Sequence, residues 1–223
     1  MTVVKVGGGL ARELGDGALR RLCGELAKLA TDRALLVVPG GGQFADAVRD
    51  CDRRFGLSPA GAHHMALLAM DQFGTLLTEL IPGAQVCADP AEAVARSSRG
   101  RAVVLRGVAA ALDGRGLPAS WEVTSDSIAL WAASAVGGRC AVLVKAVDGL
   151  YREWPARGQP PALLRADELE RLQRQGGCAG VDRYLPAALR ATGAGAWFIG
   201  GAQPQRLREL IETGSTMGTR LAP

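Results

Sequence analysis

The chain has 223 residues, of which 48% are hydrophobic and 22% are charged, so we expect a packed core rather than a disordered chain. The net charge is only +4, the arginines are scattered and 4% of residues are aromatic, which argues against a nucleic-acid partner. The sequence has no apolar stretch of 18 residues and no signal-peptide pattern, so we expect a cytoplasmic protein without a membrane partner.

Apolar runs alternate with helical patterns along the whole chain. Strands are expected at residues 3–6, 34–38, 102–106, 141–145, 196–199 and 219–221, and helices at 16–30, 43–55, 59–80, 127–136, 167–175, 184–192 and 204–213. Ser58 and Pro59 supply an N-cap and a first-turn proline for the longest of these helices. The strands are apolar throughout, which predicts an α/β fold with a parallel sheet covered on both faces.

Two glycine triplets each follow an expected strand and precede a helix. They are Gly7, Gly8 and Gly9, and then Gly40, Gly41 and Gly42. Successive backbone N–H groups at a helix start attract an anion, and glycine lets a phosphate approach closely. Neither triplet fits the Walker pattern or a dinucleotide fingerprint. A tight turn is the simpler explanation for one triplet, whereas two of them favour a phosphate site.

Lysine is rare in this chain and occurs only at Lys5, Lys28 and Lys145. Lys5 stands two residues before the first triplet, and Lys145 ends an expected strand. An ammonium group at either place can neutralise charge on a phosphoryl group during transfer. The alternative for Lys5 is an ordinary surface lysine near the start of a strand.

Asp126 follows Thr124 and Ser125 at the start of an expected helix. Taken alone, it is a first-turn acid favoured by the helix dipole, with Thr124 or Ser125 as the cap. Together with the other motifs, Asp126 is better interpreted as a carboxylate that holds Lys5 and Lys145 in position.

Taken together and in this order, these motifs resemble those of the amino acid kinase family over essentially the whole chain. The matching segments are Lys5 to Gly9, Val38 to Gly42, Thr124 to Ala129, Lys145 to Tyr151 and Gly200 to Leu221. The resemblance implies one three-layer αβα sandwich over 1–223, with a mainly parallel open sheet of about eight strands. It also implies an acceptor-binding lobe at about 1–115, an ATP-binding lobe at about 116–223 and a homo-oligomer.

The resemblance further assigns roles to the motif residues. Lys5 and Lys145 would steady the transferring phosphate, Asp126 would orient them, and magnesium would arrive with ATP rather than on protein ligands. The ATP side would comprise Gly7, Gly8, Gly9, Lys145, Val147, Asp148, Gly149 and Tyr151, with Tyr151 or Trp154 covering the adenine. The acceptor side would comprise Gly40, Gly41, Gly42, His63, His64, Thr124 and Ser125. Many members carry another lysine where this chain has residues 180–184. Either Arg183 substitutes for that lysine or Lys145 is sufficient, and both alternatives stay open.

Three local strings resemble a narrower branch, the kinases that phosphorylate an aminomethylfuran methyl phosphate in methanofuran biosynthesis, a part of one-carbon metabolism. They lie at 61–65, 69–72 and 121–123. We therefore expect an ATP-dependent kinase that turns a small phosphate monoester into a diphosphate. A histidine would bond the attacking phosphate oxygen, with His64 preferred to His63. Asp71 or Glu122 would receive the amine.

Two alternatives stay open. One is a uridylate or isopentenyl phosphate kinase-like activity. The other is a non-catalytic relative that stores an anion such as molybdate, although a degenerate site would have no need of both Lys5 and Asp126.

Overall fold

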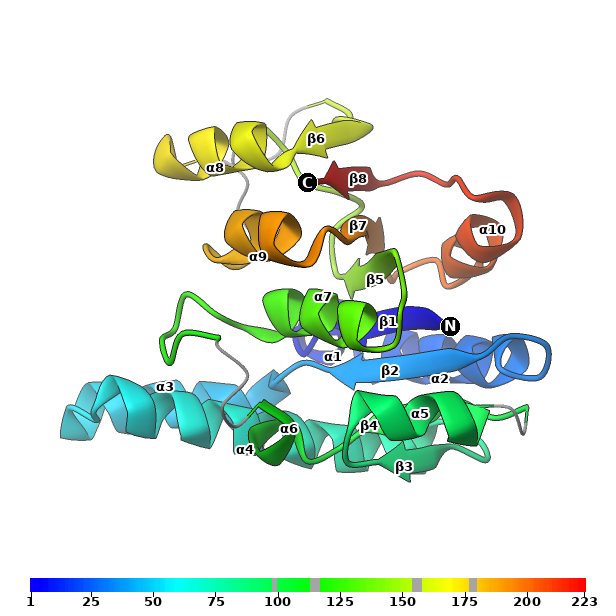
Figure 1. Ribbon diagram of the computed structural model, residues 1–223, viewed down its shortest axis with the longest axis horizontal. Helices are drawn as coiled ribbons and strands as arrows, with labels where there is room; N and C mark the ends of the chain where they lie inside the picture. The colour runs from blue at the N-terminus through cyan, green and yellow to red at the C-terminus, as the bar shows by residue number, and fades with distance from the viewer. Residues whose placement is uncertain (98–99, 113–116, 154–157, 177–179) are drawn as a thin grey trace.

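The computed structural model describes residues 1–97, 100–112, 117–153, 158–176 and 180–223, and Figure 1 shows their arrangement. Within these residues, eight strands form one sheet in the order β3-β4-β2-β1-β5-β7-β8-β6. The strands are β1 (Thr2–Val6), β2 (Leu35–Pro39), β3 (Gln85–Cys87), β4 (Val103–Leu105), β5 (Cys140–Lys145), β6 (Leu163–Arg165), β7 (Gly195–Gly200) and β8 (Thr219–Ala222). All neighbours are parallel except β7 and β8.

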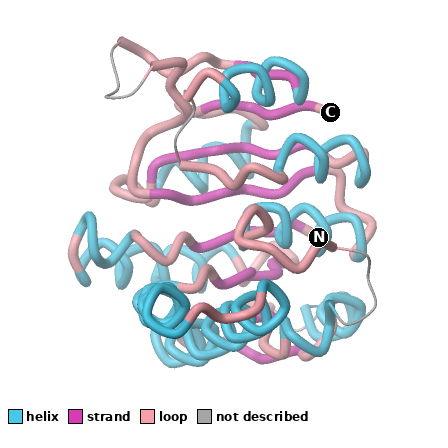
Figure 2. Tube along the Cα trace, turned by 90° about the vertical axis from the view of Figure 1, so that its left-hand side faces the viewer, coloured by secondary structure: helices cyan, strands magenta, loops and turns pink. Residues whose placement is uncertain are grey.

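Helices pack on both faces of this sheet, and Figure 2 shows the stacked strands and their helices from the side. The helices are α1 (Leu10–Leu14), α2 (Asp16–Leu29), α3 (Gly42–Phe55), α4 (Pro59–Leu80), α5 (Pro90–Ser97), α6 (Val108–Leu112), α7 (Ser125–Ala135), α8 (Ala166–Arg174), α9 (Leu185–Thr192) and α10 (Gln205–Thr213). The expected α/β sandwich with a mainly parallel sheet is confirmed.

The core is split by the sheet into two layers, because successive side chains of a strand point to opposite faces. Val3 of β1 packs in one layer with Leu130 of α7, and Val4 packs in the other with Leu22 of α2. All four side chains are fully buried. Burying each such side chain stabilises the fold by about 1.5–3 kcal/mol.

The sequence pattern located the central strands and long helices to within about two residues but missed five short elements. Those elements are α1, α5, α6 and the strands β3 and β6. Each of the two missed strands has three residues and lies at an edge of the sheet, where half-exposed residues leave no continuous apolar run. Ser58 caps α4 as expected, because its Oγ accepts the N–H of Gly61 at 3.1 Å. The sequence also suggests Asp16 as a cap of α2, but the structure has Gly15 at the N-cap position and Asp16 as the first residue of the helix.

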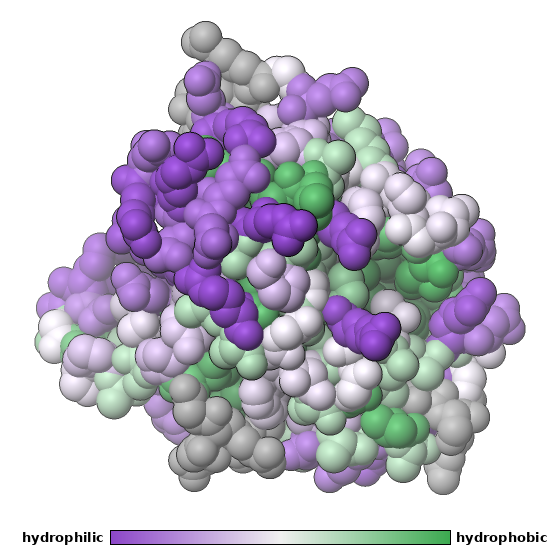
Figure 3. Space-filling view, turned by 45° about the horizontal axis from the view of Figure 1, so that its top comes forward, coloured by the Kyte–Doolittle hydropathy of each residue, from purple (hydrophilic) through white to green (hydrophobic). Residues whose placement is uncertain are grey.

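The outer surface of the C-terminal half is charged over α8. In Figure 3, hydrophilic residues gather at the upper left, where Figure 1 shows this helix. Arg174 and Arg190 both pair there with Glu170. Among the described residues, no helix has the length and apolar character needed to cross a membrane.

The central parallel strands bring the sequence motifs to one edge of the sheet. Lys5 on β1 lies opposite Val38 on β2 and Leu143 on β5, so the loops that follow these strands are neighbours. The two glycine triplets touch: the amide nitrogen of Gly8 lies 2.6 Å from the place that a Cβ on Gly40 would occupy. A Cβ on Gly8 would in turn meet the backbone of Gly42. Glycine is required at these two positions because the backbone of the other loop occupies the space that a side chain would need.

We predict opposite effects for two glycine-to-alanine substitutions. Gly8→Ala places a methyl group 2.5 Å from Gly42 Cα, so the loops must separate and the free energy of unfolding should fall. Gly24→Ala lies inside α2 with open space around the new methyl group, and helix propensity should raise the free energy of unfolding by about 0.5–1 kcal/mol. Urea denaturation measures both, and equal effects would show that the loops do not constrain each other.

Candidate active site

Three charged side chains from different elements meet at the carboxyl edge of the sheet. Asp126 of α7 lies between Lys5 of β1, whose Nζ is 2.9 Å from Oδ1, and Lys145 of β5, whose Nζ is 2.7 Å from Oδ2. The Lys5 and Asp126 side chains are 4% and 2% exposed, and that of Lys145 is 18% exposed. Lys145 also donates to the carbonyl of Gly180 at 2.6 Å. The structure thus brings together the three residues that the sequence proposes as catalytic.

Burial and mutual attraction set the charges of this cluster. Burial lowers the pKa of Lys5 to about 8, with the attraction of Asp126 opposing the shift and the repulsion of Lys145 adding to it. For Asp126, burial raises the pKa, but Lys145 and Lys5 outweigh it and bring the value to about 2. Two ammonium groups therefore face one carboxylate at neutral pH, and the positive excess suits a phosphoryl group.

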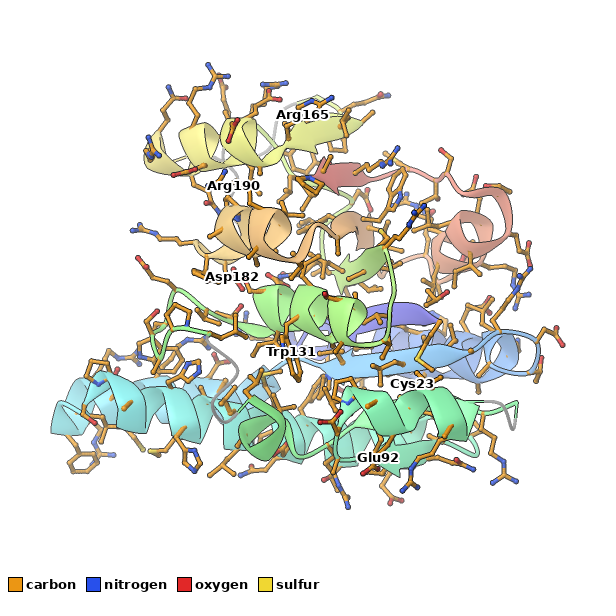
Figure 4. The ribbon with its side chains drawn as sticks, viewed as in Figure 1. Cys23, Glu92, Trp131, Arg165, Asp182 and Arg190 are labelled. Atoms are coloured by element: carbon orange, nitrogen blue, oxygen red, sulfur yellow. The ribbon has the colours of Figure 1, made fainter. Side chains whose placement is uncertain are left out.

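A second buried carboxylate, Asp182, fixes the start of α7. Its Oδ2 accepts the backbone N–H groups of Thr124 and Ser127 at 2.9 and 3.0 Å. The Thr124 hydroxyl also donates to Oδ2, and the Ser127 hydroxyl donates to Oδ1. Figure 4 labels Asp182 close to α7 and α9. Thr124 is the N-cap residue of α7, as expected, but its side chain makes no capping hydrogen bond. The carboxylate of Asp182 accepts the N–H of Ser127 in its place.

Asp182 is one of the site residues that the sequence pattern did not reveal. Its burial, together with the nearby Asp126, raises its pKa to about 6, although the donors from Ser127 and Thr124 oppose this shift. In the segment 180–184, the family resemblance points only to Arg183, as a substitute for a lysine of other members. Arg183 is exposed, whereas Asp182 is 7% exposed.

A pocket of about 360 Å³ lies over the cluster. Most of the expected phosphate-handling residues line it: Lys5, Gly7, Gly8, Gly9, Gly41, Gly42, Thr124, Ser125, Lys145 and Val147. Gly40 lies behind them, against Gly8. Of the two histidines, His63 lines the pocket and His64 is exposed outside it, so the structure favours His63 over the preferred His64.

The rest of the expected nucleotide loop does not line this pocket. Asp148 pairs with Arg206 of α10, and Gly149 packs so closely on Pro160 that a Cβ there would lie 2.6 Å from the ring. Tyr151 is half-buried outside the pocket, and Trp154 lies outside the described residues.

The two acids expected to bind an amine also lie elsewhere. Asp71 Oδ1 accepts the N–H groups of Gly107 and Val108 at 2.7 and 2.8 Å, which fixes the chain at the start of α6. Glu122 and Arg183 line a separate open hollow that adjoins Lys145.

The outer end of the pocket carries charged residues that the sequence pattern did not indicate. Arg12 of α1 and Arg49 of α3 both pair with Asp46, at 2.9 and 2.8 Å, and Arg12 also contacts Glu13. The Arg49 guanidinium lies 5.1 Å from the ring centre of Trp121. These residues come from helices on which only a few positions face the pocket, so no local spacing marks them.

Among the residues that the structure describes, no group of three or more His, Cys, Asp or Glu side chains lies close enough to hold a metal ion.

We predict that Asp182→Asn destabilises the protein. The amide offers one acceptor oxygen where the carboxylate offers two, so a buried donor of Thr124 or Ser127 loses its partner, at a cost of about 1–3 kcal/mol. Urea denaturation at pH 7.5 measures the loss. The matched control is Asp167→Asn, a 94% exposed side chain paired with Arg190 at the surface, which should change stability by less than about 1 kcal/mol. Equal losses would contradict the role of Asp182.

Comparisons with known proteins agree with this geometry. The model of the amino acid kinase family matches residues 1–196. The chain is 25% identical over 223 residues to [5-(aminomethyl)furan-3-yl]methyl phosphate kinase of Methanocaldococcus jannaschii, covering 99% of this chain and 97% of that protein. It is 32% identical over 127 residues to acetylglutamate kinase of Acidothermus cellulolyticus, covering 56% of this chain and 43% of that protein.

Solved structures with the same fold include two kinases. The uridylate kinase from Archaeoglobus fulgidus has a TM-score of 0.74 at 22% identity, with 100% of each chain covered. The UMP kinase from Bacillus anthracis has a TM-score of 0.76 at 18% identity, with 99% of this chain and 95% of that chain covered. Because the family model covers most of the chain, and the lysine–aspartate cluster lies where its motifs predict, this protein belongs to the amino acid kinase family and is a phosphotransferase.

Proposed function

We propose that this protein transfers the γ-phosphate of ATP to the phosphate group of a small monoester, and that the acceptor is [5-(aminomethyl)furan-3-yl]methyl phosphate. The observation that carries the kinase activity is the buried cluster of Lys5, Asp126 and Lys145 beside two glycine loops. The acceptor rests on the outer end of the pocket and on the full-length similarity to a kinase of that name.

In the proposed reaction, an oxygen of the acceptor phosphate attacks the γ-phosphorus. The bond from this phosphorus to the bridging oxygen breaks, and ADP leaves with the electron pair. Magnesium, when it enters with ATP, would supply further charge neutralisation. Lys5 and Lys145 stabilise the charge on the transferring group, and the backbone N–H groups at Gly8 and Gly42 hold phosphate oxygens. Asp126 keeps the two ammonium groups apart and in place.

The charges at the outer end of the pocket favour an acceptor that carries both signs. Arg12 and Arg49 can attract a phosphate, whereas Glu13 and Asp46 can attract an ammonium group. Their side chains are 42–64% exposed, so they can exchange partners when a ligand enters. The half-buried Trp121 offers an aromatic surface beside them. The furan monoester has an amine, an aromatic ring and a phosphate, whereas UMP and isopentenyl phosphate have no ammonium group.

The second candidate function is a uridylate kinase-like activity, which the shared fold of the UMP kinases favours. Isopentenyl phosphate kinase-like activity fits less well, because that acceptor would leave the carboxylates of Glu13 and Asp46 without a ligand partner. Anion storage without catalysis has no need of a buried ion triad. The cytoplasmic location and the homo-oligomer remain predictions from the sequence.

An acceptor panel tests the proposed function. Purified protein with Mg-ATP should form ADP with the furan monoester and yield a diphosphate, seen as two coupled phosphorus signals by NMR. The same assay with UMP, isopentenyl phosphate and N-acetylglutamate should give kcat/KM at least about tenfold lower, because a missing charged hydrogen bond costs about 1.5–3 kcal/mol. Preference for UMP would move the assignment to uridylate kinase activity. No ADP with any acceptor would favour storage.

Removing the Lys5 ammonium should stop catalysis without unfolding the protein. Lys5→Met keeps the length of the buried side chain and leaves Asp126 paired with Lys145, so the fold should persist while kcat falls by roughly 100-fold or more. Lys28→Met is the matched control, because Lys28 is the remaining lysine and is exposed on α2. Wild-type kcat in a folded Lys5→Met protein would remove Lys5 from the mechanism.

A further inference from the structure

His63 is the one histidine at the pocket, and the structure fixes how it can bond. It lies on α4 with its Nδ1 3.3 Å from the backbone carbonyl oxygen of Ser120. A carbonyl oxygen only accepts hydrogen bonds, so Nδ1 must carry the hydrogen. In a neutral imidazole ring the other nitrogen, Nε2, is then an acceptor with a free lone pair.

The surroundings of His63 favour the neutral ring. Burial lowers its pKa below the ordinary value, and the neighbouring His64 lowers it further, although the bond to the Ser120 carbonyl opposes this shift. A neutral imidazole uses its one N–H, at Nδ1, for the Ser120 carbonyl, so Nε2 can only accept a hydrogen bond from a ligand in the pocket.

We propose that His63 is a specificity residue that accepts, through Nε2, a hydrogen bond from a primary ammonium group of the acceptor. This inference deepens the proposed function and rests on it, because it assumes that an amine-bearing monoester occupies this pocket. A phosphate dianion has no hydrogen to offer, so a neutral Nε2 cannot stabilise it. In this proposal the acceptor phosphate is bound by Lys5, by the amides of the glycine loops and by Arg12 and Arg49, in place of the histidine that the sequence suggested.

The position of His63 suits this role. Ser120, which orients the ring, directly precedes Trp121, whose indole N–H donates to Asp52 at 2.7 Å. The segment that holds the imidazole ring is thus itself tied to α3, beside the carboxylates at the outer end of the pocket. His63 on α4 and Asp46 on α3 line the same pocket, so the proposal gives the ammonium group of the acceptor both a neutral acceptor and a carboxylate.

The tautomer can be measured without any assay of activity. The chain has only two histidines, so a protein labelled with ¹⁵N-histidine gives two rings, and the His64→Gln variant assigns them. At pH 7 we expect a protonated Nδ1 and an unprotonated Nε2 for His63. Addition of the furan monoester should shift the Nε2 signal. A protonated Nε2 in the free protein would overturn the proposal.

Kinetics with two acceptors test the specificity. The comparison compound is the same furan monoester with methyl in place of aminomethyl, and the readout is the ratio of kcat/KM for the two. His63→Asn keeps an N–H near the Nδ1 position but has no acceptor near Nε2, so the ratio should fall by roughly 10- to 100-fold. His63→Gln places its amide oxygen near Nε2 and should restore part of the ratio. His64→Asn, outside the pocket, should keep the wild-type ratio.

The outcomes separate the two claims. No transfer to the furan monoester by the wild-type protein would overturn the proposed function, and the role of His63 with it. Transfer by the wild type together with an unchanged ratio in His63→Asn would overturn the role of His63 alone.

Discussion

The site depends on one buried carboxylate between two ammonium groups. Asp126, Lys5 and Lys145 come from α7, β1 and β5, so their ion pairs exist only when helix and strands have packed in register. In water, two like charges this close would separate, and burial by itself lowers the pKa of Lys5, which Asp126 opposes. The carboxylate therefore makes a doubly cationic phosphate site compatible with a folded core.

Asp126 in turn depends on contacts that are not part of the reaction. The first turn of α7 is held by Asp182 through two backbone amides and two hydroxyl groups, and Lys145 is held by the carbonyl of Gly180. One short segment, 180–182, thus fixes both the helix that carries the aspartate and one of its lysines. A shift of this segment would move two members of the cluster together, which makes it a positioning element.

The sequence pattern was sufficient to locate the central strands, the long helices and the three charged residues at the transfer end of the pocket, by which we mean the end that holds Lys5, Asp126 and Lys145. The central strands are continuous apolar runs, and Lys5, Asp126 and Lys145 stand directly at the ends of strands or helices, where local sequence determines position. Asp182 was missed because its partners lie more than 50 residues away in the chain. The same reason explains the choice between the histidines: His63 and His64 are adjacent, and only the packing of α4 decides which one faces the pocket.

The two ends of the pocket differ in the physical means of recognition. At the transfer end the ions are buried, their partners are fixed, and glycine backbone fills the space. A side chain added to the glycine loops therefore destabilises the fold, and loss of a lysine removes positive charge from the site. At the outer end the ions of Arg12, Asp46 and Arg49 are exposed, and exposed pairs contribute little to stability. We expect substitution there to change ligand preference at low cost to folding. A common phosphoryl-transfer chemistry would then serve different acceptors within this fold, and we expect the outer end to determine the acceptor of a given chain.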